Sequence, residues 1–141
     1  MSVFNVFDVA GSAMNAQSLR LNMTASNMAN AETVAGNPED AYRAKQPVFA
    51  AVLQGAGQGA AGAAATGVQM AGQLESDAPN TPLHMPGHPE ADEDGFVYRS
   101  NVNTVEEMTN MISASRSYQN NVEVMNTSKE LALQTLELAR N

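Results

Sequence analysis

The sequence predicts a mainly α-helical protein in which two long terminal helices form an antiparallel, coiled-coil-like pair around a small β-rich or irregular insertion. Residues 102–141 contain neither proline nor glycine, and their apolar and small side chains recur at alternating intervals of three and four. Residues 4–28 show the same alternation. Because this spacing places one stripe on one face of an α-helix, the two matching stripes predict that the ends of the chain pack together.

The C-terminal helix is too long to be covered by a domain of this size. Forty helical residues extend about 55–60 Å, whereas a compact chain of this length has a radius of gyration of about 14 Å. Its seam is imperfect, because Lys129 lies at a stripe position and the step from Ser115 to Tyr118 interrupts the register. The stripe consists of Val105, Met108, Ile112, Ser115, Tyr118, Val122, Met125, Ala132, Leu136 and Ala139. We therefore expect this helix to need several neighbours.

The N-terminal helix is expected to end near Asn30, and its outer face carries almost no charge. Only Asp8 and Arg20 are charged among the first thirty residues. An uncharged polar face suits a helix that is surrounded by other protein. The alternative is a helix that is tucked into its own domain. The stripe consists of Phe4, Phe7, Gly11, Met14, Ser18, Leu21, Ala25 and Met28.

The middle of the chain predicts a small insertion between the two helices. We expect a loop at 32–43, short strands or irregular structure at 47–53 and 68–74, and a flexible Gly/Ala segment at 54–67. A rigid, proline-rich linker follows at 76–89, then an acidic turn at 90–95 and a short strand at 96–98. Asn101 or Asn103 is expected to cap the long helix. The chain is thus divided into an N-terminal helix (1–31), an insertion (32–100) and a C-terminal helix (101–141).

Composition excludes several classes of function. The chain has 141 residues, with seven Lys and Arg against fifteen Asp and Glu, and a formal net charge of −8. This balance argues against nucleic acid and anionic membrane surfaces as partners. There is no cysteine, and no run approaches the ~20 apolar residues of a membrane-inserted helix. The N-terminus lacks the features of a cleaved signal peptide, so any export is expected to depend on another signal.

Two constellations raise the question of a metal site. His84 and His88 lie near the acidic residues 92–94, but Pro86 and Gly87 prevent the helix that would bring the two imidazoles together. The sequence of 90–95 weakly resembles a calcium loop, but Asn101 occupies the position that needs a bidentate Glu. We therefore expect no metal and no cofactor. Because there is also no triad, nucleophile elbow or phosphate-binding loop, the sequence predicts a protein that is not an enzyme.

The best candidates for specific contacts are Arg116 and Tyr118 on the long helix. Arg116 could pair with a carboxylate of a neighbouring subunit. The alternative is a solvated arginine and a tyrosine that belongs to the core of the chain.

Two stretches carry a resemblance to a known family. The first is Ala25-Ser26-Asn27-Met28-Ala29-Asn30, followed by Tyr42-Arg43, and it resembles the S-N-x-A-N signature that closes the first helix of bacterial flagellar rod and hook proteins. The second runs from Pro86-Gly87-His88-Pro89 through Asn101 to Thr127, and it resembles the proximal rod proteins of that family. One departure is that 83–85 read Leu-His-Met, where the family often carries an aromatic and an acidic residue.

The resemblance implies a structural subunit of the flagellar basal-body rod, the drive shaft that crosses the periplasm and transmits motor torque. It implies that the terminal helices pack into a helical tube with copies of the same chain, with the rod proteins FlgB and FlgF, and with the adaptor FliE. It also implies export by the flagellar type III apparatus without a cleaved signal. The other hypothesis is a soluble helical hairpin that binds a single partner or a metal.

We expect the subunit contacts to lie on the two stripes, in the segment that closes the first helix, and between Met111 and Met125. The predicted interface residues are Phe7, Met14, Leu21, Ser26, Asn27, Met28, Asn30, Met108, Met111, Ile112, Arg116, Tyr118, Val122, Met125 and Leu136.

Overall fold

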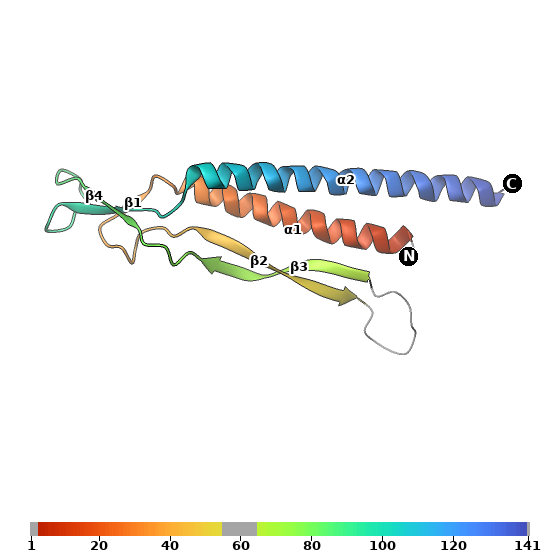
Figure 1. The fold of residues 1–141 in the computed structure, drawn as a ribbon, viewed down its shortest axis with the longest axis horizontal. Helices are drawn as coiled ribbons and strands as arrows, with labels where there is room; N and C mark the ends of the chain where they lie inside the picture. Colours follow the sequence, from red (N-terminus) through yellow and green to blue (C-terminus); the bar gives the residue numbers. More distant parts are fainter. Residues whose placement is uncertain (1–2, 55–64, 141) are drawn as a thin grey trace.

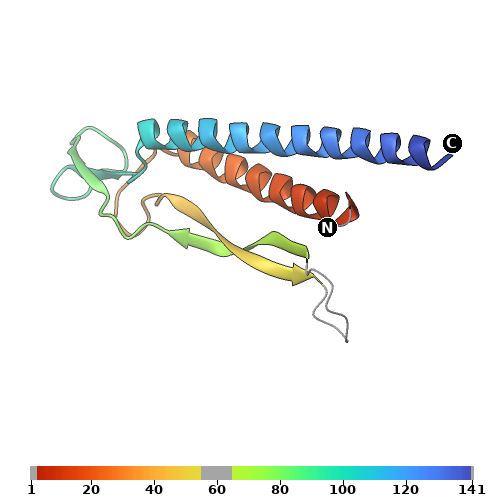
Figure 2. The same cartoon turned by 45° about the vertical axis from the view of Figure 1, so that its right-hand side comes forward.

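Two long helices lie side by side, and a β-hairpin runs along one of them. A computed structural model describes residues 3–54 and 65–140. Helix α1 (Val3–Ala29) and helix α2 (Thr104–Arg140) run antiparallel and pack against each other (Figure 1). The chain turns at one end of the molecule, where a small sheet lies, and both helices extend away from that end (Figure 2). The prediction of two long terminal helices is therefore confirmed.

Helix α2 extends well beyond the first turn of α1 (Figure 1). It has 37 residues against 27 in α1, a difference of about 15 Å at 1.5 Å per residue. Asn103 caps α2, because its Oδ1 accepts a hydrogen bond from the Val105 N–H at 3.1 Å. Glu106 and Glu107 then place negative charge in the first turn, where the helix dipole favours it.

The larger sheet is a two-stranded hairpin of β2 (Lys45–Gln54) and β3 (Ala65–Glu75). The strands pair antiparallel from Lys45↔Glu75 to Gln54↔Ala65, with a register shift at Val48/Phe49. Both strands contact α1. Ser12 on α1 accepts a hydrogen bond from the Val68 N–H at 3.1 Å. A Cβ at Gly67 would lie 3.3 Å from the same hydroxyl oxygen, so glycine allows this close approach.

The predicted fold class is wrong in one respect. The insertion is not a small addition to a mainly α-helical coiled coil, because it contains two antiparallel sheets and its hairpin covers part of α1. Strand β3 includes residues 65–67, which we expected to belong to a flexible segment. Residues 55–64 of that segment lie outside the described residues. Residues 65–67 continue the Gly/Ala-rich segment, so the side-chain pattern gave little indication that β3 begins there.

The smaller sheet has the order β1-β5-β4, with β1 at Val34–Ala35, β4 at Thr81–His84 and β5 at Phe96–Arg99. The expected strand at 96–98 is confirmed, and Val97 at its centre is fully buried. Strand β4 lies within the stretch that we expected to be a linker. Because β4 is an edge strand, Pro82 is tolerated there despite its missing N–H.

The hydrophobic core consists mostly of alanine. Among the described residues, Val97 is the only buried apolar side chain larger than alanine. The buried alanines are Ala10, Ala16, Ala31, Ala41 and Ala114. Small side chains let backbones approach closely but remove little apolar area from water, so this core alone stabilises the chain weakly.

The loop before β5 gives a direct test of the fold. Gly95 has φ +80°, and a Cβ there would lie 3.0 Å from the Cβ of Pro86. We expect Gly95→Ala to lower the free energy of unfolding by about 1–3 kcal/mol, because the new side chain adds backbone strain and crowding. Gly87→Ala is the matched control, since a Cβ there meets nothing within 4 Å. Urea unfolding of both variants measures the difference, and equal stabilities would contradict the role given to Gly95.

Candidate assembly interface

A short segment, residues 42–45, connects the two helices and the two sheets, and we call it the anchor segment. Asn27, near the end of α1, is only 1% exposed. Its Nδ2 donates to the Lys45 carbonyl at 2.8 Å, and its Oδ1 accepts from the Lys45 N–H at 2.9 Å. The Tyr42 hydroxyl donates to the same Oδ1 at 3.0 Å. One amide therefore fixes the end of α1 to the start of β2.

Two further asparagines hold the anchor segment from the other side of the chain. Asn101, just before α2, accepts a hydrogen bond from the Ala44 N–H at 2.7 Å and donates to the Ala78 carbonyl at 2.7 Å. Asn80 donates to the carbonyl of Tyr42 and to that of Arg99, each at 3.1 Å. The start of α2 and the strands of the smaller sheet are thus placed by the same four residues.

The contact between α1 and α2 is polar close to this anchor. The Arg20 guanidinium donates to Asn110 Oδ1 at 3.4 Å, and Asn110 Nδ2 donates to Glu107 at 3.5 Å. Glu107 is buried, and fully buried Ala114 follows two turns later. Of these two hydrogen bonds, only the one between Arg20 and Asn110 joins the two helices, since Glu107 and Asn110 both belong to α2. At 3.4 Å it links them loosely, so the helical pair is more firmly positioned at its anchored end than along its length.

Away from α1, helix α2 exposes many large apolar side chains. Near its start Val105, Met108 and Ile112 form one exposed stripe, with Ile112 at 55% exposure. Near its end Leu136 and Leu138 are 67% and 79% exposed. Those at 50% exposure or more are Val105, Met108, Ile112, Leu131, Leu133, Leu136 and Leu138. Exposed apolar side chains therefore occur from the start of the helix to its end.

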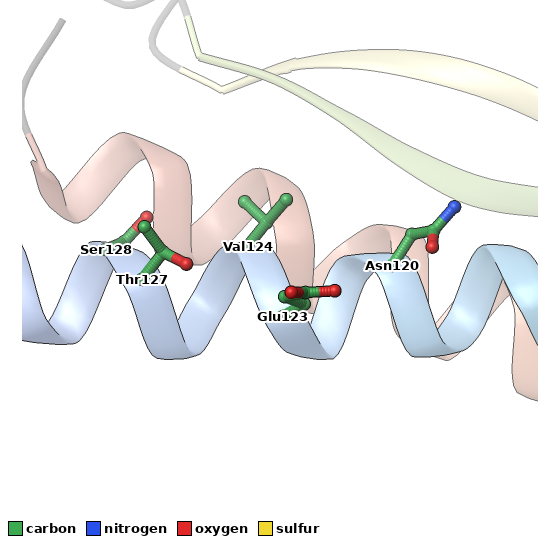
Figure 3. A pocket seen from close by; sticks show the side chains of 5 residues that line it. All are labelled: Asn120, Glu123, Val124, Thr127 and Ser128. Carbon is green, nitrogen blue, oxygen red and sulfur yellow. The ribbon is translucent and has the colours of Figure 1, made fainter.

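A shallow groove of about 360 Å³ lies on α2 around Val124 (Figure 3). It is lined by Asn120, Glu123, Val124, Thr127 and Ser128, all of them from this one helix. Four of these side chains occupy positions i, i+3, i+4 and i+7. This is the arrangement that receives a side chain of a facing helix in a coiled coil.

The structure separates the predicted interface residues into exposed, partly buried and buried groups. Those exposed on the single chain are Ser26, Met108, Ile112, Arg116, Tyr118, Val122 and Leu136. Those partly buried are Phe7, Met14, Leu21, Met28, Asn30, Met111 and Met125. Asn27 is buried inside the chain, where its hydrogen bonds give it an internal structural role. Tyr118 is 38% exposed, so it is not a fully buried core residue. Whether these residues contact other subunits stays a prediction.

Sequence reasoning missed the bonding roles of Asn80 and Asn101 and most of the leucines at the end of α2. Leu131, Leu133 and Leu138 lie off the single stripe that we traced. Four leucines within eight residues point to more than one side of the helix. This pattern could have predicted a segment that has several neighbours.

His84 ends strand β4, and His88 and the acidic turn lie in the connection from β4 to β5. The His84 ring packs against Phe96 with centroids 5.0 Å apart, and His88 Nδ1 accepts a hydrogen bond from the Glu90 N–H at 3.2 Å. Asp92 accepts a hydrogen bond from the Phe96 N–H at 2.7 Å. No cluster of three or more potential metal ligands occurs within residues 3–54 and 65–140. No helix in these ranges is both long enough and apolar enough to cross a membrane.

Comparison with known proteins agrees with this architecture. The family model "Flagella basal body rod protein" matches residues 7–36, and "Flagellar basal body rod FlgEFG protein C-terminal" matches residues 93–138. The flagellar basal-body rod protein FlgC of Yersinia enterocolitica is 50% identical over 140 residues, covering 99% of this chain and 100% of the relative. FlgC of Salmonella typhimurium strain LT2 is 49% identical with the same coverage, and FlgC of Buchnera aphidicola subsp. Baizongia pistaciae is 30% identical.

The chain is elongated, its core consists mostly of alanine, and its long helices expose apolar faces, as expected of an assembly subunit. The two family matches define its class as the structural proteins of the flagellar basal-body rod. Within this class, the chain belongs to the FlgC family of flagellar basal-body rod proteins.

The anchor segment predicts a specific stability defect. Asn27→Ala leaves the partly buried N–H and carbonyl of Lys45 without their side-chain partner. We expect a loss of about 2–4 kcal/mol in the free energy of unfolding. Asn126→Ala is the control, because Asn126 is exposed on α2. Denaturant unfolding followed by circular dichroism measures both variants. A loss at Asn27 no larger than that at Asn126 would refute the anchoring role.

Proposed function

We propose that this chain polymerises through its terminal helices into the proximal part of the rod, as one subunit of a helical shaft that transmits motor torque. The observation that carries the proposal is the exposed end of α2, where Leu131, Leu133, Leu136 and Leu138 lie beyond α1 with more than half of each residue exposed. Such a segment needs neighbours on more than one side.

Other features support the same function. The outer positions of α1 carry almost no charge, which suits contact with protein. The alanine-rich core suggests that the helices gain much of their order from assembly, as segments that fold on binding do. We therefore propose that residues 1–31 and 101–141 contribute to the rod core and that residues 32–100 form the β-rich insertion between them. A purely structural, non-catalytic role follows from this proposal.

We further propose the partners and location that the family resemblance implies. The neighbours are copies of this chain, the rod proteins FlgB and FlgF, and the adaptor FliE. The subunit works in the part of the basal body that crosses the periplasm, and it is exported by the flagellar type III apparatus without a cleaved signal. Direct binding of nucleic acid and insertion into the membrane play no part in this function.

The alternative, a soluble hairpin that binds a single partner or a metal, predicts a strongly helical, protease-resistant monomer. The family assignment and the exposed α2 face both favour the assembly subunit. Stoichiometric zinc or calcium in equilibrium dialysis would support the alternative, and we expect none.

Tyr118→Asp tests the proposed polymerisation. A carboxylate at this exposed position introduces a charge that a protein–protein contact would have to desolvate. We expect rod assembly and swimming to be abolished while the chain is still expressed at normal levels. Tyr118→Phe is the control and should swim. The measurements are a soft-agar motility assay and electron microscopy of basal bodies, and normal swimming of Tyr118→Asp would contradict the proposal.

A further inference from the structure

Helix α2 carries both a groove around Val124 and an exposed apolar stripe at its start. The groove is formed by Asn120, Glu123, Val124 and Thr127, and its apolar floor is open (Figure 3). The stripe presents Val105, Met108 and Ile112 at intervals of three and four. We propose that Ile112 of one copy of this chain inserts into the Val124 groove of a second copy. This inference rests on the proposed polymerisation and assigns one of its contacts.

Two charged side chains near the contact favour a second copy of this chain as the occupant of the groove and fix how it lies there. Arg116 lies one turn after Ile112, and Glu123 forms part of the groove wall. Both side chains are exposed, and neither forms an ion pair within the part of the chain that the structure describes. When Ile112 occupies the groove, Arg116 comes within reach of Glu123 on the second copy. The same chain thus carries both the apolar and the charged half of the contact.

In the proposed contact, the stripe and the groove of one copy are used by two different neighbours. Ile112 and Val124 are twelve residues apart, which separates them by about 120° around the helix axis and about 18 Å along it. A copy that gives its stripe to one neighbour then still presents its groove to another. Used in this way, the contact is heterologous and repeats without closing, as growth of a polymer requires.

The size of the contact also favours a polymer over a free dimer. Only a few helical turns take part, and such a contact buries less than the ~1,200 Å² of a stable complex between two proteins. The contact is therefore weak between two dilute subunits and persists where each subunit has several neighbours. Assembled basal bodies are the sample in which it can be detected.

Charge reversal in cells tests the ion pair. We expect Arg116→Glu and Glu123→Arg each to reduce the number of assembled rods by about tenfold, because each places like charges together. The double variant restores the pair and should recover assembly. Glu93→Arg makes the same charge change in the exposed turn before β5, away from α2, and should have no effect. Normal assembly of either single variant, or a double variant that fails to recover, overturns the contact.

Disulfide trapping tests the geometry independently. The chain has no cysteine, and residues 112 and 124 of one straight helix are about 18 Å apart, well beyond the ~7 Å limit for a disulfide. Oxidised basal bodies containing Ile112→Cys/Val124→Cys should therefore yield covalent multimers of this chain. The control Ile112→Cys/Asn126→Cys should yield few. If rods assemble but no multimers form, the groove contact is wrong while the proposed polymerisation stands. If no rods assemble in any variant of Tyr118, including the phenylalanine control, the polymerisation test itself has failed.

Discussion

The placement of every element depends on the backbone of residues 42–45, which three asparagine amides hold in position. Asn27 reaches it from α1, Asn101 from the start of α2, and Asn80 from the connection between β3 and β4. An amide suits this task because it carries a donor and an acceptor side by side, which match the N–H and carbonyl of a backbone segment. Aspartate would lose the donor and leucine would lose both, so a residue of the same size could not replace asparagine.

Polar anchoring of this kind compensates for the thin core. Buried alanines remove little apolar surface from water, and the Arg20–Asn110 contact between the helices is long at 3.4 Å. The hydrogen bonds made by the three asparagine side chains lie at one end of the molecule, and the exposed leucines of α2 lie at the other. We infer a gradient of stability along the subunit, from a well-determined anchored end to helix ends that lack neighbours within the chain. The residues that fix the fold and those that we propose to contact neighbours are separated in space.

This separation explains which parts of the structure were predictable from the sequence. Helical periodicity and the absence of proline and glycine predicted α2, and the alternating stripe predicted α1, because both signals are local. Short strands were expected at 47–53 and 68–74, but the hairpin is longer, because β3 begins at Ala65 inside the segment that we expected to be flexible. The internal role of Asn27 could not be predicted from the sequence. Its hydrogen bonds to Lys45 join residues 18 positions apart, and no local pattern encodes such a pairing. The candidate site was predicted in part: the stripe included Ile112 and Leu136 but missed Val124 and its groove.

The exposed stripe and groove of α2 can be understood from what a subunit needs in order to be added to a growing polymer. If α2 were a simple two-sided helix, its apolar side would be satisfied by α1 and its polar side by water, and the subunit would have no reason to associate. If one outer surface were self-complementary, two subunits would close into a symmetric pair and stop. The proposed contact avoids both outcomes, because the stripe and the groove of one copy serve different neighbours, and every added copy covers one surface and presents the other. The exposed apolar side chains that destabilise the isolated chain are therefore the ones that make its polymer extendable.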